Sequence, residues 1–200
     1  MTSSEEAVIH LSDRRITFAE GACTCTEYLR LYDFILPPNT SLSRPIESNH
    51  THIFIPFIGD LLVKKDSVLL EENQAMILGQ IEGGFVEIQN PYEADAVNFF
   101  ELVLSNTHNK EHKIISIDVQ AQPNRLLNIF QNVFLGQYSL RQEDSIKTGV
   151  ENQIFVFVIA GAYEVQNRLL QPRDGLTLCG VKTLEFESLA EESLLLVVMT

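Results

Sequence analysis

The feature that most constrains the fold of this chain is an apolar run, followed by one glycine and a second strand-like run, that occurs twice. Residues 153–165 read QIFVFVIAGAYEV, and residues 52–63 read HIFIPFIGDLLV. When Gly161 is aligned with Gly59, the leucine pairs that follow them also align, at an offset two residues shorter. Internal similarity at about half of the chain length indicates two copies of one structural unit.

Short strand-like runs, bounded by Gly, Pro, Asn or acidic turns, fill most of the chain. They lie at residues 7–11, 15–18, 28–36, 42–47, 52–59, 68–70, 75–78, 85–89, 96–104, 113–119, 133–140, 153–159 and 194–199. Many short strands at close spacing predict an all-β sandwich or closed barrel. One segment differs, because residues 123–130 place Leu126, Leu127 and Phe130 at helical spacing after a proline, which predicts a short helix or a bridging segment.

The repeat also predicts how the chain is divided. We expect one β-barrel in residues 1–105 and a second in residues 106–200, each built from one copy of the repeated unit. The strand expected at residues 7–11 precedes the first copy of the repeat. It is therefore a candidate to pack across onto the second barrel.

Composition excludes several classes of partner. The formal net charge is −13 without a basic block, and 45% of the residues are hydrophobic. Binding to a phosphate backbone requires clustered Lys and Arg, so nucleic acid is not an expected partner. The first ten residues lack the pattern of a signal peptide, and no apolar run is long enough to cross a bilayer. Three cysteines, Cys23, Cys25 and Cys179, argue against a disulfide framework and predict reduced thiols in a cytoplasmic protein.

Three segments carry a resemblance to a known family. They are GDLLVKKDSV at 59–68, GGFVEIQNPYEADAVNFFELVL at 83–104 and FVFVIAGAYEVQNRLLQPRDGLTL at 155–178. Together they resemble the pirin-like bicupins, a group that includes proteins with quercetin 2,3-dioxygenase activity, and IHLSDRR at 9–15 is similar to the opening of short bacterial members. The resemblance implies two cupin-type barrels (double-stranded β-helix, jelly-roll-like) in one chain.

The resemblance also implies where a metal would be held. In catalytically competent relatives the N-terminal barrel binds one metal, usually iron, through a His-x-His pair and a His-x-Glu pair. Residues two apart on a strand point to the same face, so two such pairs converge inside a barrel. The family spacing places the first pair at Pro45 and Glu47 and the second at Val86 and Ile88. Only Glu47 could bind a metal, and one carboxylate does not hold a transition metal.

A literal His-x-His pair, His50 and His52, lies five residues after the position that the family spacing requires. An alternative ligand set would combine Glu47 with His50 or His52 and with Glu87. Glu87, however, lies between two inward positions and is expected to face outward. The C-terminal barrel has no histidine after His112, and Phe155, Phe157, Leu176 and Leu178 are predicted to fill its pocket positions.

Two functional hypotheses follow from the resemblance. The first is a pirin-like bicupin without a catalytic metal or other cofactor, which binds a small molecule or acts as a regulatory or interaction protein. Its pocket candidates are Glu47, His52, Val86 and Ile88. The alternative is a metal-dependent dioxygenase of the quercetin 2,3-dioxygenase type, which would hold iron or another divalent metal with a non-standard set drawn from Glu47, His50 and His52.

Overall fold

A computed structural model describes residues 6–11, 21–26, 29–64, 67–79, 84–105, 112–149 and 153–199 of the chain. The regular structure of these residues consists of β-strands alone, so the predicted all-β class is confirmed. None of these residues belongs to a helix that could span a membrane. The chain forms two compact units: an N-terminal barrel of residues 15–117, and a C-terminal barrel of residues 1–14 together with 118–200.

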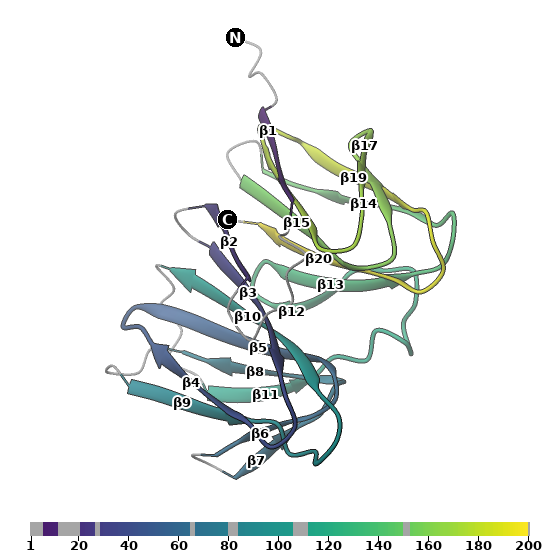
Figure 1. Cartoon of the computed structure of the whole chain (residues 1–200). Coiled ribbons are helices and arrows are strands. Elements are labelled where there is room, and N and C mark those ends of the chain that lie inside the picture. Colours follow the sequence, from purple (N-terminus) through teal and green to yellow (C-terminus); the bar gives the residue numbers. More distant parts are fainter. Residues whose placement is uncertain are drawn as a thin grey trace. The chain divides into compact units, whose positions relative to one another are not determined.

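The N-terminal barrel contains one six-stranded and one four-stranded antiparallel sheet (Figure 1). The larger sheet has the order β11-β8-β5-β10-β3-β2, and the smaller has the order β4-β9-β6-β7. The strands are β2 (Gly21–Thr26), β3 (Leu29–Leu36), β4 (Ser41–Ile46), β5 (His50–Ile58), β6 (Leu61–Val63), β7 (Val68–Leu70), β8 (Gln74–Leu78), β9 (Gly84–Gln89), β10 (Val97–Ser105) and β11 (His112–Ser116).

The C-terminal barrel repeats this arrangement. Its larger sheet has the order β1-β18-β15-β20-β13-β12, and its smaller sheet has the order β14-β19-β16-β17. The strands are β1 (Glu6–Leu11), β12 (Leu127–Phe130), β13 (Val133–Tyr138), β14 (Glu143–Lys147), β15 (Gln153–Ala160), β16 (Tyr163–Val165), β17 (Arg168–Leu170), β18 (Asp174–Cys179), β19 (Thr183–Ser188) and β20 (Ser193–Met199).

The repeat read from the sequence corresponds to equivalent strands of the two barrels. The first copy forms β5 and β6, and the second forms β15 and β16. Gly59 and Gly161 end the two long strands with φ angles of 75° and 74°. Because a residue with a Cβ adopts a positive φ only at a cost, glycine is favoured at both turns.

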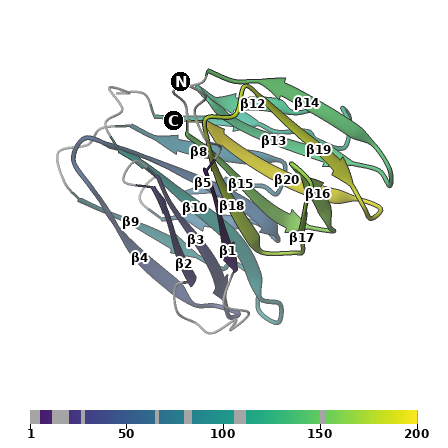
Figure 2. The same ribbon diagram turned by 90° about the horizontal axis from the view of Figure 1, so that it is seen from above.

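The division between the barrels differs from the expected one at residues 105 and 106. It lies between Ile117 and Asp118, because β11 pairs with β8 of the N-terminal barrel. The N-terminal strand β1 pairs with β18, beside which Figure 2 draws it, so it belongs to the C-terminal barrel. β1 therefore takes the edge position in one large sheet that β11 takes in the other.

The short helix considered for residues 123–130 is wrong. Residues 127–130 form β12, which pairs with β13. Asn124 holds the preceding turn, since its backbone N–H donates to the carbonyl of Gln137 and its side chain accepts from the backbone N–H of Ser139. The helical spacing of three apolar residues was overridden because an edge of the large sheet offers the segment cross-strand hydrogen bonds.

Two predictions fall on residues that the structure does not describe. The strand expected at residues 15–18 lies outside the described ranges, as do the side chains of Cys23 and Cys25. Cys179, at the end of β18, is a free, half-buried thiol.

Each barrel has an apolar interior between its two sheets. In the N-terminal barrel, Phe54 and Phe99 of the large sheet pack with Val86 and Ile88 of the small sheet. In the C-terminal barrel the prediction for two phenylalanines is wrong. Leu176 and Leu178 do point inward, but their cross-strand partners on β15 are Val156 and Ile154. Phe155 and Phe157 therefore lie on the other face of the large sheet.

Two tyrosines are fully buried in the C-terminal barrel. The hydroxyl of Tyr138 donates to Asp144 Oδ2 at 2.5 Å, and that of Tyr163 donates to the carbonyl of Ser193 at 2.8 Å. Burial raises the pKa of both phenols well above their ordinary value, and for Tyr138 the bond to Asp144 raises the pKa further. Both hydroxyls therefore stay protonated in the folded chain at mildly alkaline pH.

This burial predicts a loss of stability in alkali. Above pH about 10 the two tyrosines ionise in the unfolded state but not in the folded state, so the free energy of unfolding falls by about 1.4 kcal/mol per pH unit for each of them. Urea unfolding between pH 9 and 11 measures the slope, and Tyr138→Phe is expected to make it shallower. An unchanged slope in that variant would contradict the prediction.

Candidate functional site in the N-terminal barrel

The inward positions of β4 differ by one residue from those predicted. Arg44 and Ile46 are buried, whereas Pro45 is exposed and Glu47 lies half-exposed in the turn after β4. Arg44 is the cross-strand partner of Val86, and residues paired in this way share one face of the sheet. Pro45 therefore points away from the interior, which corrects its predicted place in a ligand pair.

Strand β5, which lies between Gly59 and β4, contains a β-bulge. Along β5, Ile58 pairs with Asn98 but Phe99 pairs with Pro56, so β5 carries one extra residue at Phe57. A bulge inverts the in-and-out alternation beyond it. The count from Gly59 back to β4 crosses both this bulge and a turn in which Asn49 has a φ of 64°.

The second predicted pair lies as counted, but it belongs to the core. Val86 and Ile88 point inward and are 5% and 0% exposed, within the apolar cluster of the barrel. Glu87 points outward, where its Oε1 accepts from Lys64 Nζ at 2.6 Å. Glu87 is therefore excluded from any ligand set in the interior.

His52 is the predicted residue that the structure places at the centre of a polar network. Its side chain is 1% exposed, and both ring nitrogens have partners. Nε2 lies 3.2 Å from the backbone nitrogen of Glu47, which can only donate. Nε2 therefore accepts, and Nδ1 carries the proton that it donates to Glu101 Oε1 at 2.7 Å. These bonds fix His52 as a neutral imidazole of one tautomer.

Glu101 and Arg44 complete the network, and neither was predicted. Glu101 lies in the middle of β10 and is fully buried, and its Oε2 accepts from Arg44 Nε at 2.6 Å. The Arg44 guanidinium carbon lies 4.6 Å from the ring centre of Tyr32 and 4.8 Å from that of Phe34. One feature of the sequence could have indicated the network: Glu101 is a single carboxylate within the largely apolar run VNFFELVL.

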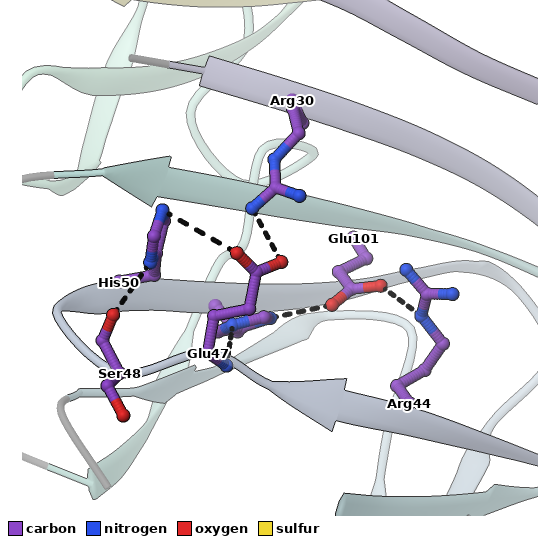
Figure 3. Close-up of polar contacts among 7 residues, drawn as sticks. Arg30, Arg44, Glu47, Ser48, His50 and Glu101 are labelled. Atoms are coloured by element: carbon purple, nitrogen blue, oxygen red, sulfur yellow. Dashed lines mark hydrogen bonds and ion pairs between the residues drawn. The ribbon is translucent and has the colours of Figure 1, made fainter. Parts of the chain in front are cut away.

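A second set of polar contacts surrounds Glu47, which Figure 3 shows between Arg30 and His50. Arg30 Nη2 donates to Glu47 Oε1 at 2.6 Å, and His50 Nε2 lies 3.7 Å from Glu47 Oε2. Partial burial lowers the pKa of Arg30, but the hydrogen bond to Glu47 and the effect of Tyr32 outweigh it, so the pKa is raised. His50 Nδ1 is 2.9 Å from the carbonyl oxygen of Ser48.

The residues of this interior do not fit a divalent metal. No group of three His, Cys, Asp or Glu among the described residues is placed to bind one. Both nitrogens of His52 are hydrogen-bonded, and the carboxylate of Glu101 is shared between His52 and a permanent cation. Glu47 and His50 do lie together, but they are only two donors.

A six-stranded sheet facing a four-stranded sheet, present once in each half of the chain, defines a protein of two cupin-type barrels. Residues 101–199, about half of the chain, match the model of the quercetinase C-terminal cupin domain. The chain therefore belongs to the pirin-like bicupin family.

Solved structures have the same fold at low sequence identity. YhhW from Escherichia coli superposes with a TM-score of 0.76 and 9% identity, over 96% of this chain and 97% of that chain. Bacterial pirin YhhW in complex with nickel(II), also from Escherichia coli, gives 0.72 and 9%, over 96% and 98%. Quercetin 2,3-dioxygenase from Acinetobacter baumannii gives 0.68 and 13%, over 96% and 79%. No curated protein sequence matches the chain significantly.

Proposed function

We propose that this chain is a bicupin that works without a catalytic metal, as a small-ligand-binding or regulatory protein. The observation that supports the proposal is the buried network of Arg44, Glu101 and His52 in the N-terminal barrel. In this network every donor nitrogen and carboxylate that a metal would require is already bonded to another group of the chain. The proposed partner is a small molecule or a protein in the cytoplasm, and not a nucleic acid, because the net charge is −13.

A dioxygenase of the quercetin type is the alternative. It is favoured by one observation, the approach of His50 to the Glu47 carboxylate at the half-exposed edge of the network. Such an enzyme would need a third donor, and His52 could supply one only if Nε2 left the backbone N–H of Glu47. We place this function second because it costs the hydrogen bond that the buried Nε2 accepts and leaves the Glu47 N–H without its acceptor.

Elemental analysis combined with a quercetin assay tests the proposal. We expect the purified chain to hold far less than one iron, nickel or manganese per molecule, before and after incubation with each metal, and to leave quercetin unoxidised in air. Stoichiometric metal that is lost in His52→Ala would overturn the metal-free proposal. His50→Ala is the companion variant: a metal held by Glu47, His50 and His52 would be lost in it as well, although His50 is not part of the buried network.

A second experiment tests whether the metal-free chain binds a ligand without converting it. If the interior or its rim binds small aromatic ligands, quercetin should raise the melting temperature of the metal-free chain without being consumed. Consumption of quercetin by metal-free protein would contradict the proposal as strongly as bound metal would.

A further inference from the structure

The surroundings of Arg44 have the composition of a binding site for an organic cation. Two aromatic rings of β3, Tyr32 and Phe34, are stacked with their centres 6.0 Å apart, and the guanidinium lies over both of them. The Glu101 carboxylate from β10 meets it from the side at 2.6 Å. Aromatic faces and a carboxylate are the groups that recognise guanidinium ions in proteins, through cation–π attraction and charge-assisted hydrogen bonds.

The charges of the network require one cation at this place. Glu101 is fully buried, and His52 is neutral in the tautomer that its partners impose. A buried carboxylate without a positive partner is strongly unfavourable. Arg44, whose side chain is 11% exposed, supplies one positive charge and brings the network to neutrality.

A guanidinium suits the site better than a divalent metal does. It is planar and weakly hydrated, and it can stack on rings while it donates to a carboxylate. A divalent ion would bring a second positive charge that the described side chains around Glu101 do not balance. The buried residues of β9, the strand that pairs with β4, are Val86 and Ile88. Their side chains carry no atom that could bind a metal.

We propose that the N-terminal barrel contains a site for a guanidinium-type organic cation, formed by Tyr32, Phe34 and Glu101, which Arg44 occupies as a ligand supplied by the chain itself. This inference deepens the metal-free function proposed above and rests on it. Arg44 comes from β4 of the small sheet, whereas the three other residues come from the large sheet. The occupied site therefore ties the two sheets of the barrel together without a metal.

The test is to remove the internal ligand and to supply it from solution. Arg44→Ala should lower the melting temperature by roughly 10 °C, because Glu101 is left buried without its cation. Millimolar methylguanidinium chloride should restore a large part of this loss, whereas sodium chloride of the same ionic strength and nickel(II) chloride should not. The wild-type chain, in which the site is already filled, should show no such increase.

The double variant R44A/E101Q is the matched control. It keeps the space left by the arginine but lacks the carboxylate, so methylguanidinium should not stabilise it. If R44A is isolated unfolded, the same comparison is made on the yield of folded protein after dilution from urea with each salt.

Three results would overturn the inference: no rescue of R44A by methylguanidinium, equal rescue of R44A/E101Q, or rescue of R44A by nickel(II). None of them requires the wild-type chain to bind metal. They are therefore distinct from the result that would overturn the proposed function, which is stoichiometric metal in the wild-type chain.

Discussion

Replacing Glu101 by alanine is expected to lower the free energy of unfolding by about 3–5 kcal/mol. The carboxylate is fully buried and accepts from both Arg44 and His52. Its removal leaves a buried guanidinium without its counter-charge and the Nδ1–H of His52 without its acceptor. An unpaired buried charge costs more than the pair contributes, which is why the loss exceeds the value of an ordinary hydrogen bond.

Urea unfolding followed by far-UV circular dichroism and tyrosine fluorescence measures the effect, since the chain has no tryptophan. Glu47→Ala provides a matched control, because Glu47 also pairs with an arginine at 2.6 Å but its side chain is 40% exposed. Solvent screening limits such a pair to about 1 kcal/mol or less. Equal losses in the two variants would show that burial does not set the strength of this network.

The fold could be predicted because the signals that specify it are local. Turns that favour glycine recur at Gly59 and Gly161, and the apolar runs before them have the length of strands. These signals depend on neighbours within about ten residues, which a sequence displays directly. The all-β class and the duplicated barrel follow from them.

The site could not be predicted in the same way, because it depends on long-range pairing. Arg44 and Glu101 are 57 residues apart and meet only when β4 of one sheet faces β10 of the other. The inward orientation of Arg44 follows from its pairing with Val86 on β9, which lies 42 residues further along the chain. His52 was singled out for its spacing to His50, but its partner is the buried Glu101.

The division of the chain was missed for a related reason. β1 and β11 are both short edge strands, and either large sheet could accept either strand on local evidence alone. Which sheet a strand joins is decided by register and burial, as in the six paired residues of β1 and β18. The sequence left β1 as a candidate for the second barrel, and its pairing with β18 places it there. Sequence order assigned β11 to the second barrel, whereas its pairing with β8 assigns it to the first.

Replacing Gly161 by alanine is expected to destabilise the chain by about 2–5 kcal/mol, through two additive causes. The first is the φ of 74°, which costs a residue with a Cβ about 1–2 kcal/mol. The second is steric, because the new Cβ would overlap Oγ of Ser193 and would lie 2.6 Å from its Cβ and 2.7 Å from its backbone Cα, at the start of β20. The Oγ could rotate away, but the Cβ and Cα are fixed by the strand. Overpacking against backbone adds roughly 1–3 kcal/mol, since a main chain held in a sheet cannot rotate away.

Gly59→Ala separates the two causes. Gly59 has the same φ, but the atoms that its Cβ would meet first belong to the side chains of Val97 and Tyr92, at 2.8 and 3.0 Å. Side chains can shift more easily than a paired strand, so this variant should lose less stability than Gly161→Ala, as measured by urea unfolding. Gly84→Ala, which meets nothing within 4 Å, should be close to neutral. If Gly59→Ala proved as costly as Gly161→Ala, the positive φ alone would account for glycine in both copies of the repeat, and the close approach of β20 would not contribute.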